Sequence, residues 1–363
     1  MQRRGQVSRL EKKHHPLLEV PALSLEARNL KPPHRYRDLF IIAAYLVAVL
    51  VSAAALAPLF YAVGKWLLHT SQGHGWDQIK SLSWFMVPLS KTDFRGYFDR
   101  AVLVVALVGL WPLAKLLHLK RHEITGTVPF STGWKQLLIS FALAAALLLV
   151  MGAVCLWLGA CKMNRNPAWF ALVAPLISGL VVACLEEFLF RGAVLGILRR
   201  TLSERSGVFW TTMLFAIVHF LKPPDQSVSD VADVNWSSGF LHVTRLFSGF
   251  GRWNDFVGEF LLLVGVGWVL ARARLATGSL WAGIGLHAGW VAGMKYFNQL
   301  TDTTKPLRDG AFAPWMIENH CKAIVSPVVG FVPLIAILIT GILTLWIARG
   351  WRGRDVEKHV LRV

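Results

Sequence analysis

The feature that most constrains this chain is a series of long apolar segments. The segments 136–158 and 324–347 contain no charged residue between their first and last positions. A helix needs about 20 apolar residues to cross the hydrocarbon layer of a bilayer, which is ~30 Å thick. Segments of this length and composition are therefore predicted to span a membrane.

Six further segments are apolar over a comparable length. The eight predicted spans are residues 39–63, 101–119, 136–158, 168–190, 207–221, 255–271, 277–297 and 324–347. Hydrophobic residues make up 55% of the 363 residues and the mean hydropathy is +0.49, which is too apolar for an ordinary soluble domain. The sequence predicts an all-α fold, a polytopic integral membrane helical bundle of about eight transmembrane helices.

The formal net charge of +17 has the sign typical of nucleic-acid-binding proteins, but its distribution indicates a membrane topology instead. Basic residues gather in the amino-terminal arm, in every second connection between spans, and after the last span. They are nine Lys or Arg in 1–38, Lys120, Arg121, Arg199, Arg200, Arg205, Arg272, Arg274 and five Lys or Arg in 349–362. Because this alternation follows the positive-inside rule, we expect both termini in the cytoplasm and no nucleic-acid partner.

The chain shows no internal repeat and no segment able to bury a core of its own, so we expect one membrane domain. Along it we distinguish a basic cytoplasmic tail (1–38), three transmembrane helices (39–160), a core of four transmembrane helices (161–300), and an outer loop, last transmembrane helix and basic cytoplasmic tail (301–363). The four cysteines lack the paired spacing of a structural zinc site. Cys161 and Cys321 fall on the same predicted outer side, which leaves open a disulfide between them in an oxidising compartment.

Two adjacent carboxylates and an arginine interrupt the fourth apolar segment, in the stretch 184-CLEEFLFRG-192. A charge within the membrane is costly, so such residues usually face the protein interior and serve a function. Glu187 and Arg191 are four positions apart on one helix face, where the arginine can neutralise the acid. Glu186 is rotated by about 100° from Glu187 and has no such partner in sequence, which makes it the candidate base.

Two histidines lie on later apolar segments. Phe215 and His219 share a helix face, and His287 lies among glycines, in 283-GIGLHAGW-290, that allow close helix packing. A carboxylate that polarises water, with two imidazoles to share its proton or stabilise an oxyanion, suffices for peptide-bond hydrolysis. For Glu186 to reach the level of His219, we expect span four to continue as a helix to about Leu198.

The ordered motifs EExxxR and FxxxH, followed by a histidine in a glycine-rich helix, resemble those of the CAAX protease and bacteriocin-processing (CPBP) family. The resemblance covers roughly residues 168–295 and places a CPBP-like catalytic core within 161–300. It implies an intramembrane endopeptidase of the glutamic type, in which Glu186 and His219 activate water and His287 helps to stabilise the oxyanion. In this interpretation Glu187, Arg191 and Phe215 support the site, and no cofactor is needed.

The sequence departs from the family pattern at one position. The family usually has Asn or Asp four residues after the last histidine, where this chain has Val291. Loss of one oxyanion donor typically lowers a protease rate by about 10²–10³. Either another group, such as the indole N–H of Trp290, supplies the donor, or activity is weak or lost.

Other interpretations stay open. Glu186, His219 and His287 would suit the three-ligand plan of a catalytic zinc site, although the chain has no HExxH motif. Val291 favours a catalytically silent membrane scaffold or a bacteriocin-immunity protein. A transporter would also carry ionisable groups within the membrane, but the internal repeats and paired broken helices typical of transporters are not evident in the sequence.

The predicted partners are the lipid bilayer and a peptide or membrane-anchored protein substrate. Prenylated CAAX proteins, leader peptides and proteins cut near the bilayer are all compatible with the motifs. Because the family that the motifs resemble has many bacterial members, we expect an integral protein of the bacterial inner membrane.

Overall fold

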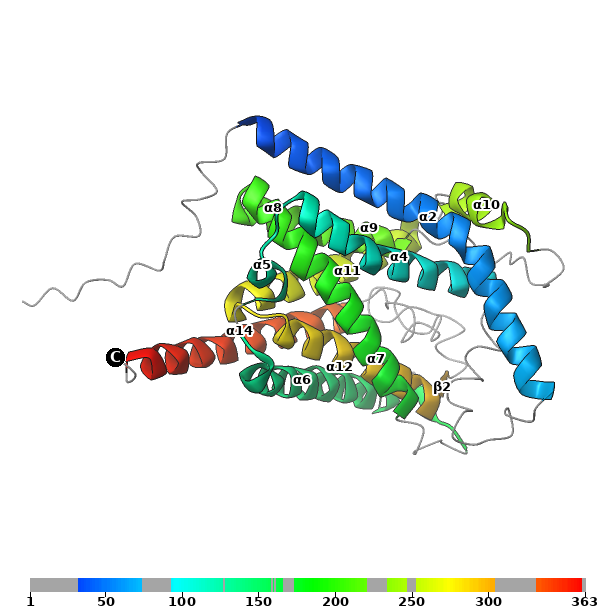
Figure 1. The fold of residues 1–363 in the computed structure, drawn as a ribbon. Coiled ribbons are helices and arrows are strands. Elements are labelled where there is room, and N and C mark those ends of the chain that lie inside the picture. The colour runs from blue at the N-terminus through cyan, green and yellow to red at the C-terminus, as the bar shows by residue number, and fades with distance from the viewer. Residues whose placement is uncertain are drawn as a thin grey trace, which may run out of the picture.

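The structure is a computed structural model that describes residues 32–73, 93–126, 128–157, 159, 161–165, 173–220, 234–246, 253–303 and 331–360. Within these ranges the chain forms a bundle of helices with one short two-stranded sheet (Figure 1). The prediction of an all-α, polytopic helical fold is confirmed.

The helices follow one another along the chain as expected from the apolar segments. They are α2 (Pro32–Gly73), α4 (Phe94–Leu116), α5 (Arg121–Thr125), α6 (Phe130–Trp157), α7 (Val173–Glu187), α8 (Leu195–Thr201), α9 (Glu204–Phe220), α10 (Ser238–Arg245), α11 (Trp253–Thr277), α12 (Trp281–Leu300) and α14 (Phe331–Val360). A π-helix, η2 (Phe188–Val194), joins α7 directly to α8. Strands β1 (Cys161–Met163) and β2 (Thr301–Thr303) pair in antiparallel fashion.

Five helices of the described part are long and apolar enough to cross a membrane: α2, α4, α6, α11 and α14. Only 22–44% of their apolar windows is buried within the protein, so most of this surface is available to lipid. Phe40 on α2 and Trp346 on α14 are examples of large exposed apolar side chains. Because α7, α9 and α12 are not among the five, the count of eight spans stays a prediction.

Helix α2 carries Pro58 in its interior. Proline removes a helix hydrogen bond and clashes with the preceding turn, which bends a helix. Figure 1 shows α2 changing direction in its second half. This helix packs on α4, where Tyr61 makes edge-on ring contacts with Phe94 and Tyr97.

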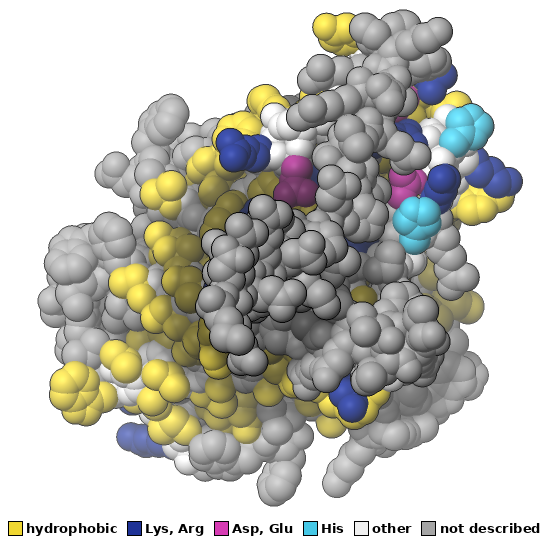
Figure 2. Space-filling model, turned by 90° about the vertical axis from the view of Figure 1, so that its left-hand side faces the viewer, with side chains coloured by type: hydrophobic (Ala, Val, Ile, Leu, Met, Phe, Trp, Pro, Cys, Tyr) yellow, Lys and Arg dark blue, Asp and Glu magenta, His cyan; other side chains and the backbone are white. Residues whose placement is uncertain are grey.

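The basic connections lie at one end of the bundle. Figure 1 shows the start of α2, α5, α8 and the end of α14 at this end, whereas β2 lies at the opposite end. Figure 2 looks onto this end, where basic, acidic and histidine side chains gather over one part of the surface. Arg200 donates there to Asp38 Oδ2 (3.3 Å) and to the Leu117 carbonyl oxygen (2.7 Å). The first and last described helices therefore begin and end on the same side.

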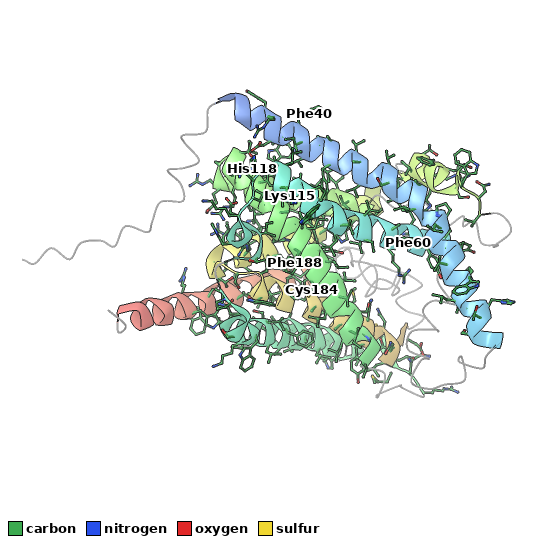
Figure 3. The ribbon with its side chains drawn as sticks, in the orientation of Figure 1. Phe40, Phe60, Lys115, His118, Cys184 and Phe188 are labelled. Atoms are coloured by element: carbon green, nitrogen blue, oxygen red, sulfur yellow. The ribbon has the colours of Figure 1, made fainter. Side chains whose placement is uncertain are left out.

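Helix α12 packs against α6 and α7 in the interior of the bundle. A Cβ atom at Gly285 would collide with the carbonyl oxygen of Leu137 on α6, and one at Gly289 would lie 2.6 Å from that of Phe141. Small residues four positions apart let helix backbones approach closely. In Figure 3, Cys184 and Phe188 lie in the middle of the bundle, whereas Phe40 lies at its outer edge.

Candidate active site

The two adjacent carboxylates lie at the junction of α7 and η2. Glu187 is the last residue of α7, and the helical path continues through η2 and α8 to Thr201. The expectation that span four extends to about Leu198 is therefore confirmed. A π-helical turn widens the helix locally and is frequent at functional sites.

Glu187 and Arg191 form a buried ion pair. Arg191 Nη1 lies 2.8 Å from Glu187 Oε1, and both side chains are 0% exposed. Arg191 Nη2 also donates to the carbonyl oxygen of Gly267 on α11 at 3.3 Å, and the guanidinium carbon lies 4.3 Å from the ring centroid of Phe215 on α9. The arginine thus links η2 to α9 and α11, and its charge is balanced within the protein.

Glu187 has a second partner, His287 on α12. The Oε1 atom of Glu187 lies 3.1 Å from Nδ1 of His287. Because a carboxylate paired with arginine can only accept, Nδ1 carries the proton and Nε2 of the neutral ring is an acceptor. Gly283 leaves room for this contact, since a Cβ atom there would lie 2.7 Å from Glu187 Oε2. Glu187 therefore fixes the orientation and the tautomer of His287.

The orientation of His219 is fixed by its own helix. Its Nδ1 lies 2.8 Å from the carbonyl oxygen of Phe215, one turn earlier on α9. A carbonyl oxygen can only accept, so Nδ1 is the donor and Nε2 of the neutral ring is an acceptor. The Phe215 ring packs against the imidazole with centroids 4.5 Å apart. Phe215 thus contacts both Arg191 and His219.

Glu186, His219 and His287 converge from three helical segments. Glu186 Oε2 lies 3.7 Å from His219 Nε2 and 3.8 Å from His287 Nε2. The side chains of Glu186, His219 and His287 are 13%, 25% and 7% exposed respectively, so the group is mostly buried but remains partly accessible. Glu186 Oε2 is buried and makes no hydrogen bond to the described residues. Three acceptor atoms thus face one another at a spacing that suits a hydrogen-bond donor, such as water, between them.

The residue that departs from the family pattern, Val291, has an apolar side chain with no hydrogen-bond donor. Val291 is half-buried on α12, one turn after His287. Trp290 packs in the hydrophobic cluster of α6, α11 and α14, with Leu262, Leu270 and Ile337 among its members. We therefore assign the indole of Trp290 to packing rather than to the oxyanion.

Among the described side chains, no group of three or more His, Cys, Asp or Glu residues is arranged to hold a metal ion. The zinc alternative for Glu186, His219 and His287 stays untested, and no step below passes through a metal. Cys321 lies outside the described residues, so the disulfide option with Cys161 stays untested.

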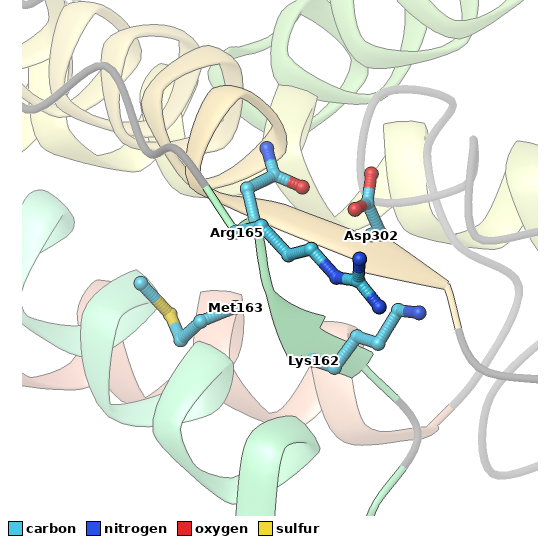
Figure 4. Close-up of a pocket in the computed structure, with 5 residues that line it drawn as sticks. Lys162, Met163, Arg165 and Asp302 are labelled. Carbon is cyan, nitrogen blue, oxygen red and sulfur yellow. The ribbon is translucent and has the colours of Figure 1, made fainter.

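A cavity lies at the end of the bundle that carries the sheet, away from the three converging side chains. It has a volume of about 540 Å³ and is lined by Lys162, Met163, Asn164, Arg165 and Asp302 (Figure 4). Its wall belongs to β1, β2 and the residues after β1. We do not place the chemistry there, because it contains no residue of the predicted site.

Comparison with known proteins supports the predicted resemblance. Residues 167–293 match the model of the family described as Type II CAAX prenyl endopeptidase Rce1-like. The matched region contains Glu186, Glu187, Arg191, Phe215, His219 and His287. No curated protein and no solved structure matches the chain.

Proposed function

We propose that this chain, whose residues 167–293 form a Type II CAAX prenyl endopeptidase Rce1-like domain, hydrolyses peptide bonds with water activated by Glu186 and His219. The family is one of intramembrane endopeptidases, and five described helices are able to span a membrane. The observation that carries the proposal is the approach of Glu186 Oε2 to Nε2 of His219 and of His287.

The arrangement favours water as the nucleophile. A water molecule bound by Glu186 and His219 donates its two hydrogens to Glu186 Oε2 and His219 Nε2, which leaves a lone pair of its oxygen for the scissile carbonyl carbon. As the new C–O bond forms, one proton of the water passes to Glu186 and the carbonyl becomes an oxyanion. Collapse of this intermediate breaks the C–N bond, and the proton moves to the leaving amine nitrogen.

His287 is suited to stabilise the oxyanion. When its ring is protonated, Nε2–H can donate to the negative oxygen while Nδ1–H donates to Glu187. The carboxylate of Glu187 then balances the positive charge of the imidazolium, much as the acid of a catalytic triad does. Because Val291 provides no second donor, we expect turnover about 10²–10³ below that of a site with two donors.

The proposal is tested with the purified full-length protein in detergent, a library of fluorogenic peptides, and the substitution Glu186→Gln. We expect Glu186→Gln to lower kcat/KM by at least about 10³, because it removes the proton acceptor. Glu204→Gln is the matched control, since Glu204 is an exposed carboxylate paired with Arg199 on the surface. Equal cleavage by wild type and Glu186→Gln would overturn the mechanism.

Two further results of the cleavage assay distinguish the proposed protease from the zinc-dependent protease and from a catalytically silent protein. Addition of a zinc chelator is expected to leave the rate unchanged, whereas a loss that added zinc restores would support the zinc-dependent protease. Absence of cleavage by the wild-type protein across the library would favour a silent scaffold or immunity protein.

We also propose that both termini lie in the cytoplasm and that the protein resides in a bacterial inner membrane, with a peptide or membrane-anchored protein as substrate. The basic residues at the end shared by α2 and α14 support this orientation. Reporter enzymes fused to the carboxyl terminus, active either only in the cytoplasm or only outside it, test the assignment.

A further inference from the structure

The hairpin of β1 and β2 joins the ends of two packed helices, α6 and α12. Strand β2 begins at Thr301, directly after α12 ends at Leu300. Asn164 extends the pairing beyond β1, because its backbone N–H donates to the Leu300 carbonyl oxygen (2.8 Å) and its side-chain amide donates to that of Gln299 (2.7 Å). A two-stranded hairpin is marginally stable alone, so the bundle holds this hairpin and the cavity that it lines in place.

Three exposed charged side chains line the cavity. Lys162 and Asp302 are directly opposite each other in the antiparallel pair, and Arg165 lies two residues after the end of β1. Figure 4 shows the charged ends of these three side chains on one side of the hairpin, whereas Met163 points to the other side. Among the described residues, none of the three has a partner in an ion pair. Two cations and one carboxylate are therefore available to a ligand that carries charges of both signs.

The cavity lies close to the point where α6 leaves the membrane. The part of α6 that is able to span a bilayer, Gly133–Trp157, ends five residues before Lys162. The side chain of Trp157 is 84% exposed, and tryptophans at the ends of membrane spans typically lie at the level of the lipid headgroups. The cavity volume of about 540 Å³ is within the range of small-ligand sites. A lipid headgroup is therefore the ligand of mixed charge that this position favours.

We propose that the cavity binds the headgroup of a phospholipid that carries a phosphate and a primary ammonium group, such as phosphatidylethanolamine. Lys162 and Arg165 donate to the phosphate oxygens, and Asp302 accepts from the ammonium. Asn164 Oδ1 is a further acceptor, because the amide nitrogen is engaged with Gln299. The carboxylate disfavours a purely anionic headgroup, and the methylated ammonium of phosphatidylcholine has no N–H to donate. This inference does not depend on the proposed function, because the cavity contains no residue of the predicted active site.

The first experiment measures lipid binding to the purified full-length protein by native mass spectrometry in detergent. Phosphatidylethanolamine, phosphatidylglycerol and phosphatidylcholine are each titrated, and we expect the wild type to bind phosphatidylethanolamine with the lowest Kd. Lys162→Gln with Arg165→Gln should raise this Kd by about 5- to 10-fold, between the effects of exposed ion pairs and of charge-assisted hydrogen bonds. Lys135→Gln, which removes an exposed lysine near the other end of α6, is the matched control and should leave the Kd unchanged. Equal Kd values of the wild type for the three lipids would overturn the proposal.

The substitution Asp302→Asn tests the selectivity between the lipids. Loss of the carboxylate should weaken the binding of phosphatidylethanolamine and strengthen that of phosphatidylglycerol. Because the two affinities move in opposite directions, we expect the ratio of the two Kd values to change by about 10-fold in favour of phosphatidylglycerol. A misfolded variant would lose affinity for both lipids, so this shift is specific to the cavity. An unchanged ratio would overturn the assignment of Asp302 to the ammonium group.

Soluble phosphoethanolamine shares the chemistry of the headgroup and is distinguished by thermal unfolding in detergent. Phosphatidylethanolamine should raise the unfolding temperature of the wild type more than that of the variant with both Lys162→Gln and Arg165→Gln. Soluble phosphoethanolamine at the same concentration should have no effect, because it lacks the acyl chains whose burial in the micelle keeps the headgroup beside the cavity. An equal rise with the soluble compound would assign the cavity to a free phosphate ester and overturn the lipid assignment.

Discussion

Helices α12 and α14 share an apolar composition but face different surroundings. Residues 282–290 of α12 are all buried, including His287 and Trp290, whereas Ile342 and Trp346 of α14 are 65% and 69% exposed. The described helices that hydropathy identifies most readily are those that face lipid. Helix α12 is instead marked by glycines and by His287, because it packs against protein on most sides.

The largest effect that this comparison predicts is a loss of catalytic activity when the contact between Glu187 and His287 of α12 is altered. Glu187→Gln removes the carboxylate that orients His287 and balances its charge, while the amide still fills the space. We expect kcat/KM to fall by about 10²–10⁴, as when the acid of a catalytic triad is neutralised. The measurement is the peptide cleavage assay, with Glu204→Gln as the exposed control. Unchanged activity would remove Glu187 from the site.

The second prediction concerns the stability that the buried ion pair provides. Arg191→Met leaves Glu187 as an uncompensated buried charge, so we expect a loss of about 3–5 kcal/mol in the free energy of unfolding. Thermal unfolding in detergent, followed by circular dichroism, measures it. Arg199→Met breaks the exposed pair with Glu204 and should cost at most about 1 kcal/mol.

A double substitution separates stability from activity at this pair. Glu187→Gln with Arg191→Met removes both charges, so stability should recover much of the loss seen for Arg191→Met alone. Activity should stay low, because His287 still lacks its carboxylate. Recovery of both properties together would contradict the role of Glu187 in orienting His287.

Sequence reasoning succeeded where the information is local or carried by an ordered set of motifs. The Glu187–Arg191 pair follows from a spacing of four residues, and the helical fold follows from the apolar segments. The contacts of Glu187 with His287 and of Lys295 with Ser178 join residues 100 and 117 positions apart. No periodicity encodes such contacts, because they depend on how α7 and α12 cross. The π-helix after Glu187 has no motif of its own in the sequence either.

The third prediction uses two glycines, one on each of the compared helices. At Gly285 a Cβ atom would collide with the backbone of α6, so Gly285→Ala should cost about 1–3 kcal/mol despite the better helix propensity of alanine. At Gly350 on α14 a Cβ atom meets nothing within 4 Å, so Gly350→Ala should be neutral or stabilise by up to about 1 kcal/mol. The unfolding temperature should therefore fall for Gly285→Ala and stay the same or rise for Gly350→Ala. An unchanged or raised unfolding temperature for Gly285→Ala would mean that α12 does not depend on this glycine for packing.

The smallest effect is expected on the lipid-facing side of α14. Ile342→Ala should change the free energy of unfolding by less than about 0.5 kcal/mol, because lipid or detergent tails replace the lost contacts. On α12, Ile284 is 1% exposed and packs with Ala183 and Ala288, so Ile284→Ala should cost about 2–5 kcal/mol. Both variants are compared by thermal unfolding in the same detergent. A large cost at Ile342 would mean that this face of α14 is covered by protein, for instance a second copy of the chain, and the contrast between the two helices would then disappear.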